Sequence, residues 1–423
     1  MFKKTTLKNG LRIITVPQAN TEAVTVLALV GTGSKYETKE ISGISHFLEH
    51  LFFKGTKERP TPLEVIEPLD KVGGIYNAFT GEDYTGYYTK VAASHLDLAL
   101  EWVSDIYLNS LFPLNDIERE RGVIIEEINM YLDSPMIYVG EVWKDLLYGD
   151  QPAGWDVAGN KETIRKISRK QILDYKESQY TASNTIICVA GNFKEKAVIE
   201  KIKKYFSRIS ESGFKQKEKV LESQRNPKSL LFFKTTDQTH FCLGVRAYNL
   251  FHPQKYALEL LSVILGGSGM MSNRLFTEVR EKRGLAYYVR TDAESDSDVG
   301  YLVTRAGVDN SKIDSAIEII LREYKKISTV KVSEGELEKA KENVKGKLAL
   351  SLESSDAKAN FYAGQEIMEK EILSPDEIFK RIDKVSANDI LKVAKDVFQL
   401  KNLNLAMIGP FKNKERFQRL LKL

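Results

Sequence analysis

The hydrophobic and polar positions along the first half of the chain switch repeatedly between the period of a strand and that of a helix. The pattern predicts strands at residues 11–16, 24–30, 77–79 and 85–91. It predicts helices at residues 42–53, 96–109 and 117–132. Because short connections join neighbouring strands, we expect an α+β fold, with a mainly antiparallel sheet and helices packed on one face.

The chain repeats itself once. Residues 167–193 align without a gap to residues 385–411, at an offset of 218, and each copy predicts a helix followed by a buried strand that ends in glycine. A repeat of this length is too long for a solenoid and indicates two homologous domains. We therefore expect domains at residues 1–208 and 229–423.

Residues 209–228 separate the two predicted domains. The segment is polar and charged and contains Pro227, as expected of a linker. The alternative is a long surface loop within a single domain, but the repeat on either side of the segment favours the linker.

The composition is that of a chain that can bury a large core. Of 423 residues, 42% are hydrophobic and 28% are charged, which excludes global disorder. The net charge of +4 is small and dispersed, so nucleic acid is not an expected partner. The two cysteines, Cys188 and Cys242, lie in separate apolar runs, which argues against both a disulfide framework and a cysteine zinc site.

The N-terminal residues contain no targeting signal that we can identify. Lys3 and Lys4 are not followed by an apolar segment, and the apolar run at 24–30 is far shorter than the roughly 20 residues that a membrane span needs. We therefore expect a cytoplasmic protein without a membrane partner.

The strongest chemical signal is the sequence HFLEH, from His46 to His50. On a helix, residues four apart share a face, so both imidazoles can bind one Zn²⁺. Glu49 lies three residues after His46 and can reach the water that such a metal activates. The alternative is a surface helix that carries two unrelated histidines.

A zinc site of this kind needs a third ligand and an open fourth position. The predicted helix at 117–132 offers two adjacent candidates, Glu126 and Glu127. Between His50 and Glu127 lie 76 residues, and the residues alone leave both glutamates open as the third ligand.

This spacing resembles that of the family of pitrilysin, insulin-degrading enzyme and the mitochondrial processing peptidase, which is marked by HxxEH and a glutamate after about 76 residues. The resemblance covers the whole chain. It implies one Zn²⁺ per chain, bound by His46, His50 and Glu127, with Glu49 as the base. The family also has a glutamate seven residues before the ligand. Glu120 stands seven residues before Glu127, so the resemblance implies Glu127, and not Glu126, as the third ligand. Glu120 would then hydrogen-bond a ligating histidine; the alternative is a solvated helix charge.

The second half of the chain lacks these ligands. The repeat offset takes His46, Glu49 and His50 to positions 264, 267 and 268, which hold isoleucine, glycine and serine. Position 345, the counterpart of Glu127, is lysine. The repeat therefore predicts that the metal site belongs to the first domain alone.

Two further features match the family. Arg280 and Tyr287 have the spacing of the family's Arg/Tyr pair, which binds the substrate carbonyl and stabilises the oxyanion. The alternative is a helix cap and a sheet-packing tyrosine. Asn77, Ala78 and Phe79 resemble the family's edge strand, on which a peptide lies by β-addition; the alternative is a core strand.

The resemblance thus implies a zinc-dependent endopeptidase that cleaves unfolded peptides inside a chamber. Family members build this chamber from four such domains, so a chain that supplies two implies a homodimer. One alternative is a non-catalytic scaffold subunit, although the ligands and the Arg/Tyr pair occur together in this chain. The other is a zinc hydrolase of a small non-peptide, which the edge strand disfavours.

Overall fold

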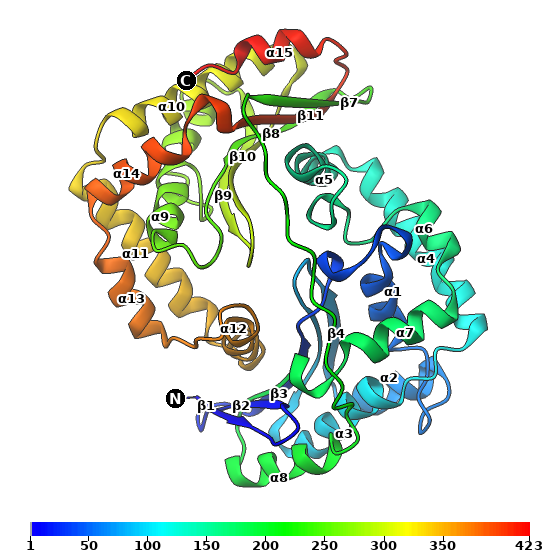
Figure 1. Ribbon diagram of the computed structural model, residues 1–423. Helices are drawn as coiled ribbons and strands as arrows, with labels where there is room; N and C mark the ends of the chain where they lie inside the picture. The colour runs from blue at the N-terminus through cyan, green and yellow to red at the C-terminus, as the bar shows by residue number, and fades with distance from the viewer. Residues whose placement is uncertain (1) are drawn as a thin grey trace. The chain divides into compact units, whose positions relative to one another are not determined.

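The computed structural model describes residues 2–423 and contains two compact units, neither of which is continuous in sequence. Unit 1 comprises Met1–Asn129, Asp156–Glu218 and Leu350–Ser374. Unit 2 comprises Met130–Trp155, Lys219–Ala349 and Pro375–Leu423. Each unit is built around one sheet (Figure 1).

The sheet of unit 1 has six strands in the order β1-β2-β6-β3-β5-β4. Its strands are β1 (Lys3–Thr6), β2 (Arg12–Pro17), β3 (Ala23–Val30), β4 (Ile75–Thr80), β5 (Thr85–Ala92) and β6 (Thr185–Gly191). Neighbours run antiparallel except for β2 and β6, which are parallel. The mainly antiparallel sheet predicted from the sequence is therefore confirmed, and β4 lies at one edge.

Apart from one helix described below, the α-helices of unit 1 lie mostly toward the sheet face that carries Tyr87, whose ring contacts Phe52 and Tyr107. They are α1 (Ile44–Leu51), α2 (Pro62–Asp70), α3 (Leu96–Asn109), α4 (Leu114–Asp133), α6 (Lys161–Lys166), α7 (Arg169–Gln179) and α8 (Glu195–Tyr205). Helix α3 contacts β3 and β5, and its Tyr107 hydroxyl lies 2.7 Å from the hydroxyl of Thr185. The last residues of α4, from Met130 onward, belong to unit 2.

The sheet of unit 2 has five strands in the order β7-β11-β8-β10-β9. They are β7 (Lys228–Phe233), β8 (Gln238–Arg246), β9 (Ala286–Ser295), β10 (Gly300–Asp309) and β11 (Leu403–Gly409). Strands β7 and β11 are parallel, and the other neighbours are antiparallel. The two sheets thus share one arrangement, to which unit 1 adds β1.

The helices of unit 2 include one π-helical segment, η6 (Phe276–Glu281). The α-helices are α5 (Pro135–Tyr148), α9 (Lys255–Leu265), α10 (Ile313–Thr329), α11 (Glu334–Ser351), α13 (Pro375–Asp383), α14 (Ala387–Val397) and α15 (Lys414–Leu420). Short 3₁₀ turns in the chain lie at Ser34–Tyr36, Lys39–Ile41, Ala93–His95, Pro152–Gly154, Ala182–Asn184, Asn310–Lys312 and Leu400–Asn402.

Each sheet also carries one helix on its other face, and that helix comes from the other half of the sequence. In unit 2, Phe241 and Leu243 face the core formed with α9, α10 and α14, whereas Cys242 between them faces α5. In unit 1, Leu27 and Leu29 face α12 (Ser355–Met368). Figure 1 shows α12, in orange, beside the blue strands of unit 1. The sequence pattern did not predict this exchange, in which each half of the chain supplies one helix to the sheet of the other half.

Polar contacts fix the exchanged helix α12 on its sheet. The buried Glu366 carboxylate accepts hydrogen bonds from Lys4 Nζ at 2.8 Å and from Arg12 Nη1 at 3.4 Å. Near the other end of α12, Lys90 Nζ donates to Asp356 at 2.7 Å. Both ends of the helix are therefore tied to strands of unit 1.

The predicted linker at 209–228 has neither helix nor strand over most of its length, and the units divide inside it, between Glu218 and Lys219. On the side of unit 1, Lys217 Nζ donates to Asp83 Oδ1 at 2.6 Å. On the side of unit 2, the Leu221 backbone N–H donates to Gln151 Oε1 at 2.8 Å. The segment is thus held along its length by contacts to the unit on each side.

Among the helices of residues 2–423, none combines the length with the apolar character that a membrane span requires.

Candidate active site

Helix α1 is held at its N-terminus by the buried carboxyl group of Glu37. Glu37 accepts hydrogen bonds from the backbone N–H groups of Gly43, at 2.7 Å, and Ser45, at 2.8 Å. These N–H groups have no partner within the helix, so the two oxygens of the carboxyl group satisfy them. Gly43 has φ of 93°, and a Cβ there would lie 2.7 Å from the Ala158 carbonyl oxygen, so both conformation and space require glycine.

The buried side of α1 rests on α7. The Tyr175 hydroxyl lies 2.8 Å from Ser45 Oγ and 2.8 Å from Thr32 Oγ1. Phe47 and Leu48 are fully buried. These contacts fix the rotation of the short helix about its own axis, and the periodicity then places His46, Glu49 and His50 on its other side.

The structure brings the two histidines of α1 to Glu127 of α4. Glu127 Oε2 lies 3.6 Å from His46 Nε2 and 3.4 Å from His50 Nε2. The three residues each offer one ligand atom, and these atoms lie within 4.8 Å of one another. Two imidazole nitrogens and one carboxylate oxygen, converging in this way, suit Zn²⁺. Glu126, the alternative left open by the sequence, is exposed on the same helix.

Glu120 contacts the His50 ring at Nδ1, the nitrogen that does not face Glu127. Its Oε2 is 3.2 Å from His50 Nδ1, and its Oε1 is 2.9 Å from Lys54 Nζ. Burial alone would raise the pKa of Glu120, but these two partners outweigh it and lower the pKa. Glu120 therefore stays ionised and holds the His50 ring with Nε2 toward Glu127.

The two imidazoles differ electrostatically. Burial lowers the pKa of His46 to about 4, which keeps this ring neutral, the form that binds a metal. Burial also disfavours the charged form of His50, but Glu120 and Glu127 outweigh it and raise the pKa to about 9. The carboxylates around His50 therefore favour positive charge at this position.

Glu49 points toward the end of strand β4. Its Oε2 accepts a hydrogen bond of 2.6 Å from the Thr80 hydroxyl. Burial raises the pKa of Glu49 above its usual range, against the opposing effects of Thr80 and His50. Glu49 thus lies on the same helix as both histidines and is held by a neutral donor.

Strand β4 places the predicted peptide-binding residues at a sheet edge, because it pairs with β5 and ends the strand order. Asn77 is exposed, Ala78 is buried, and Phe79 is half-buried. A Cβ on Gly86 would lie 2.3 Å from the Phe79 ring, so glycine in β5 makes room for that ring. The backbone edge of β4 is consistent with strand addition.

Arg280 and Tyr287 also lie together, in unit 2. The Arg280 guanidinium lies 4.8 Å from the ring centroid of Phe276 and 5.2 Å from that of Tyr287. Arg280 belongs to the π-helical segment η6, a type of helix often found at functional sites. The Tyr287 side chain, at 78% exposure, is open to a ligand.

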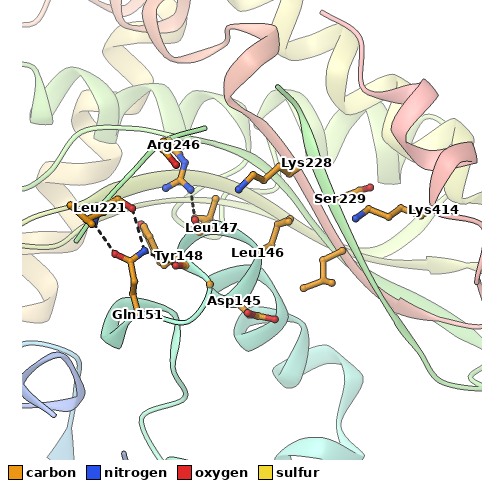
Figure 2. Close-up of a pocket in the computed structure, with 13 residues that line it drawn as sticks. Asp145, Leu146, Leu147, Tyr148, Gln151, Leu221, Lys228, Ser229, Arg246 and Lys414 are labelled. Atoms are coloured by element: carbon orange, nitrogen blue, oxygen red, sulfur yellow. Dashed lines mark hydrogen bonds between the residues drawn. The ribbon is translucent and has the colours of Figure 1, made fainter. Parts of the chain in front are cut away.

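Unit 2 also contains a cavity of about 330 Å³ beside the end of α5. Figure 2 shows Arg246 donating to the Leu147 carbonyl and Gln151 hydrogen-bonded to the Leu221 backbone across it. These side chains are already engaged in fixing α5 and the linker. No histidine or cysteine is among the described residues that line the cavity, and we assign no reaction to it.

The comparisons with known proteins agree with the resemblance. The family model described as insulinase (peptidase family M16) matches residues 12–156, and the model described as peptidase M16 inactive domain matches residues 166–344. The chain belongs to the M16 peptidase family. The second of these models begins at residue 166, within the first half of the chain, and all the residues that it matches lie after the HxxEH motif and Glu127.

M16 relatives match the chain along nearly its full length. A Bacillus subtilis protein named an uncharacterized zinc protease is 35% identical over 98% of this chain and 99% of its own. A Mycobacterium leprae protein of the same designation is 31% identical over 99% of this chain and 94% of its own. The names of these relatives support zinc as the metal and peptidase as the class.

Solved structures extend the likeness to the fold. A protease from Helicobacter pylori has 25% identity and a TM-score of 0.91, and the match covers 97% of this chain and 99% of that one. A Pseudomonas fluorescens structure described as a peptidase M16 inactive domain has a TM-score of 0.89 at 14% identity, over 97% of this chain and 98% of that one. The two-domain M16 fold is therefore shown.

Sequence reasoning missed three residues that shape this M16 site. Glu37 and Tyr175 hold α1 through contacts between segments far apart in sequence, and no local pattern marks either residue. Thr80 could have been found, because strand alternation places it on the face of Ala78, at the end of the predicted edge strand.

Proposed function

We propose that the chain is a zinc-dependent endopeptidase that cleaves unfolded peptides. The observation that carries the proposal is the convergence of His46, His50 and Glu127 beside Glu49. A zinc ion held by those three residues would supply Lewis-acid polarisation of a peptide carbonyl and of water.

The chain's own residues supply the remaining chemistry. The Glu49 carboxylate takes a proton from the attacking water and returns it to the leaving amine nitrogen. Arg280 and Tyr287 donate hydrogen bonds to the carbonyl oxygen as negative charge develops on it. The edge of β4, at Asn77, Ala78 and Phe79, pairs with the main chain of an extended peptide and so makes little demand on its sequence.

Metal content and peptide cleavage, measured together, test these assignments. Purified protein should contain about one zinc per chain and cut an unstructured fluorogenic peptide, and a chelator should abolish cleavage. Glu49→Gln should keep zinc and lose turnover, whereas His46→Ala and Glu127→Gln should lose zinc. Glu126→Gln, at the exposed neighbour, is the matched control and should behave as wild type. Loss of zinc in Glu49→Gln, or full activity in Glu127→Gln, would contradict the proposed roles of these two residues.

The alternative function is that of a non-catalytic scaffold subunit. It is suggested by the match of residues 166–344 to a family model that describes an inactive peptidase domain. The same experiment separates the two functions. A scaffold would bind zinc and leave a library of unstructured peptides uncut.

We also propose a homodimer that encloses the substrate and acts in the cytoplasm. An enclosed site admits flexible peptides and excludes folded domains. Light scattering should give twice the chain mass of 48.0 kDa. Unstructured peptides of tens of residues should be cut, and a stable folded protein should resist cleavage; equal rates for both would exclude the enclosure.

A further inference from the structure

Thr80 connects the edge strand of unit 1 to the helix that carries the HxxEH motif. It is the last residue of β4, and its hydroxyl donates to Glu49 Oε2 at 2.6 Å. This is the short distance of a hydrogen bond from a hydroxyl to a carboxylate. The carboxylate proposed as the base is therefore bonded to the strand proposed to bind the peptide.

Without the hydrogen bond from Thr80, the Glu49 carboxylate could adopt several orientations. A glutamate side chain loses rotamer freedom only where contacts fix it, and proton transfer requires the base within hydrogen-bond reach of the proton. Within residues 2–423, the Thr80 hydroxyl is the side-chain donor that meets this carboxylate. Thr80 also leaves one carboxylate oxygen, Oε1, available to accept a proton.

We propose that Thr80 is a positioning residue, which orients the Glu49 carboxylate and ties that orientation to β4. The proposal rests on the proposed peptidase function. Thr80 acts through Glu49, so its removal should slow turnover while zinc content and peptide affinity stay unchanged.

Thr85 provides a matched control in the neighbouring strand. It lies directly opposite Thr80 in the β4–β5 register, but its hydroxyl donates to the Thr32 carbonyl oxygen at 2.8 Å. Thr85→Val removes a hydroxyl from the same strand pair without touching Glu49. Its turnover should therefore stay within about twofold of wild type.

The kinetic test compares Thr80→Val, which keeps the shape and removes the donor, with Thr80→Ser, which keeps the donor. Thr80→Val should lower kcat by about 10- to 100-fold with KM and zinc content unchanged, because a misplaced base costs rate and not binding. Thr80→Ser should recover most of kcat. A Thr80→Val enzyme within twofold of wild type, or a serine variant as slow as the valine variant, would overturn the proposal.

A double-mutant cycle on the zinc-free protein gives a readout that does not depend on activity. The free energy of unfolding is compared for wild type, Thr80→Val, Glu49→Ala and the double variant. A bonded pair should be non-additive, with the double variant less destabilised than the two single effects predict. Additivity would show that the two side chains do not interact and would overturn the proposal.

The two measurements also separate this proposal from the proposed function. Wild-type protein that cleaves no peptide, together with a non-additive cycle, would refute the peptidase function but leave the link between Thr80 and Glu49 intact. Zinc-dependent cleavage together with an additive cycle would refute the role of Thr80 alone.

Discussion

His50 Nδ1 lies 3.2 Å from Glu120 Oε2, while Nε2 of the same ring lies 3.4 Å from Glu127. One imidazole thus meets a carboxylate at each nitrogen, and the two carboxylates come from the same face of α4, seven residues apart. Glu120 orients the ring through Nδ1. Glu127 lies beside Nε2, the nitrogen that would bind the metal.

Removal of the Glu120 carboxylate should weaken metal binding without abolishing it. Glu120→Ala leaves the His50 ring unsupported at Nδ1, and such partners typically contribute about 10- to 100-fold in metal affinity. Competition with a chromogenic chelator should show an affinity loss of that size, compared with complete loss for His46→Ala. An unchanged affinity in Glu120→Ala would show that the contact with His50 does not support metal binding.

Glu37 should make stability depend on pH. Burial raises its pKa to about 8 from the ordinary 4.5, although the N–H groups of Gly43 and Ser45 favour its charged form. A carboxyl whose pKa is raised by folding stabilises the native state fully below pH 4.5. That contribution is lost as the pH rises to 8, by a few kcal/mol. The Tyr175 hydroxyl, which faces Glu37 from α7, stays neutral because burial raises its pKa too.

Glu37→Gln is the variant that tests this, because its amide cannot ionise. The NH2 group of glutamine cannot accept a hydrogen bond, whereas the hydroxyl oxygen of the neutral carboxyl can, so the variant should be less stable at low pH. Urea unfolding at pH 5, 6.5 and 8 should show wild type losing stability relative to the variant as the pH rises. Parallel pH profiles for the two proteins would contradict the assignment.

Glu366 should anchor the exchanged helix α12. Glu366→Gln breaks a charged contact in which the Glu366 side chain is 3% exposed and the Arg12 side chain 15% exposed. The expected loss of stability is about 1–3 kcal/mol, seen as a lower melting temperature. Asp356→Asn at the other end of α12 is the control. Its pair with Lys90 is more exposed, so the loss should stay below about 1 kcal/mol. Equal losses would show that burial does not distinguish the two contacts.

Arg280 should affect turnover and not metal content. Its guanidinium lies within 5.2 Å of the ring centroids of both Phe276 and Tyr287, and these contacts orient its donors. Arg280→Ala should lower kcat/KM by about 100-fold or more, the usual cost of removing an oxyanion donor, with about one zinc per chain retained. Lys282→Ala, at an exposed neighbour paired with Glu278, should remain near wild type. Wild-type kinetics in Arg280→Ala would assign the residue to helix packing.

Local sequence patterns located much of the fold. The helix predicted at residues 96–109 is α3, with the same bounds, and the strand predicted at 85–91 is β5 with one residue added. These predictions succeed because a helix or strand face that is buried imposes its own period on the residues that form it. Strand β1 was missed because Lys3–Thr6 is polar and largely exposed, so no burial pattern marks it.

The sequence by itself determined the reactive groups: the HxxEH spacing puts His46, Glu49 and His50 on one side of any helix they form, and the repeat restricts them to one half of the chain. Only the tertiary structure decided which distant groups meet them, among them Glu127 rather than Glu126, Thr80 at Glu49, and Glu37 at the start of α1. It also decided that α5 and α12 each pack on the sheet of the other half. The reason is that periodicity specifies which face of an element is buried, whereas the partner on which it is buried depends on long-range packing and charge pairing.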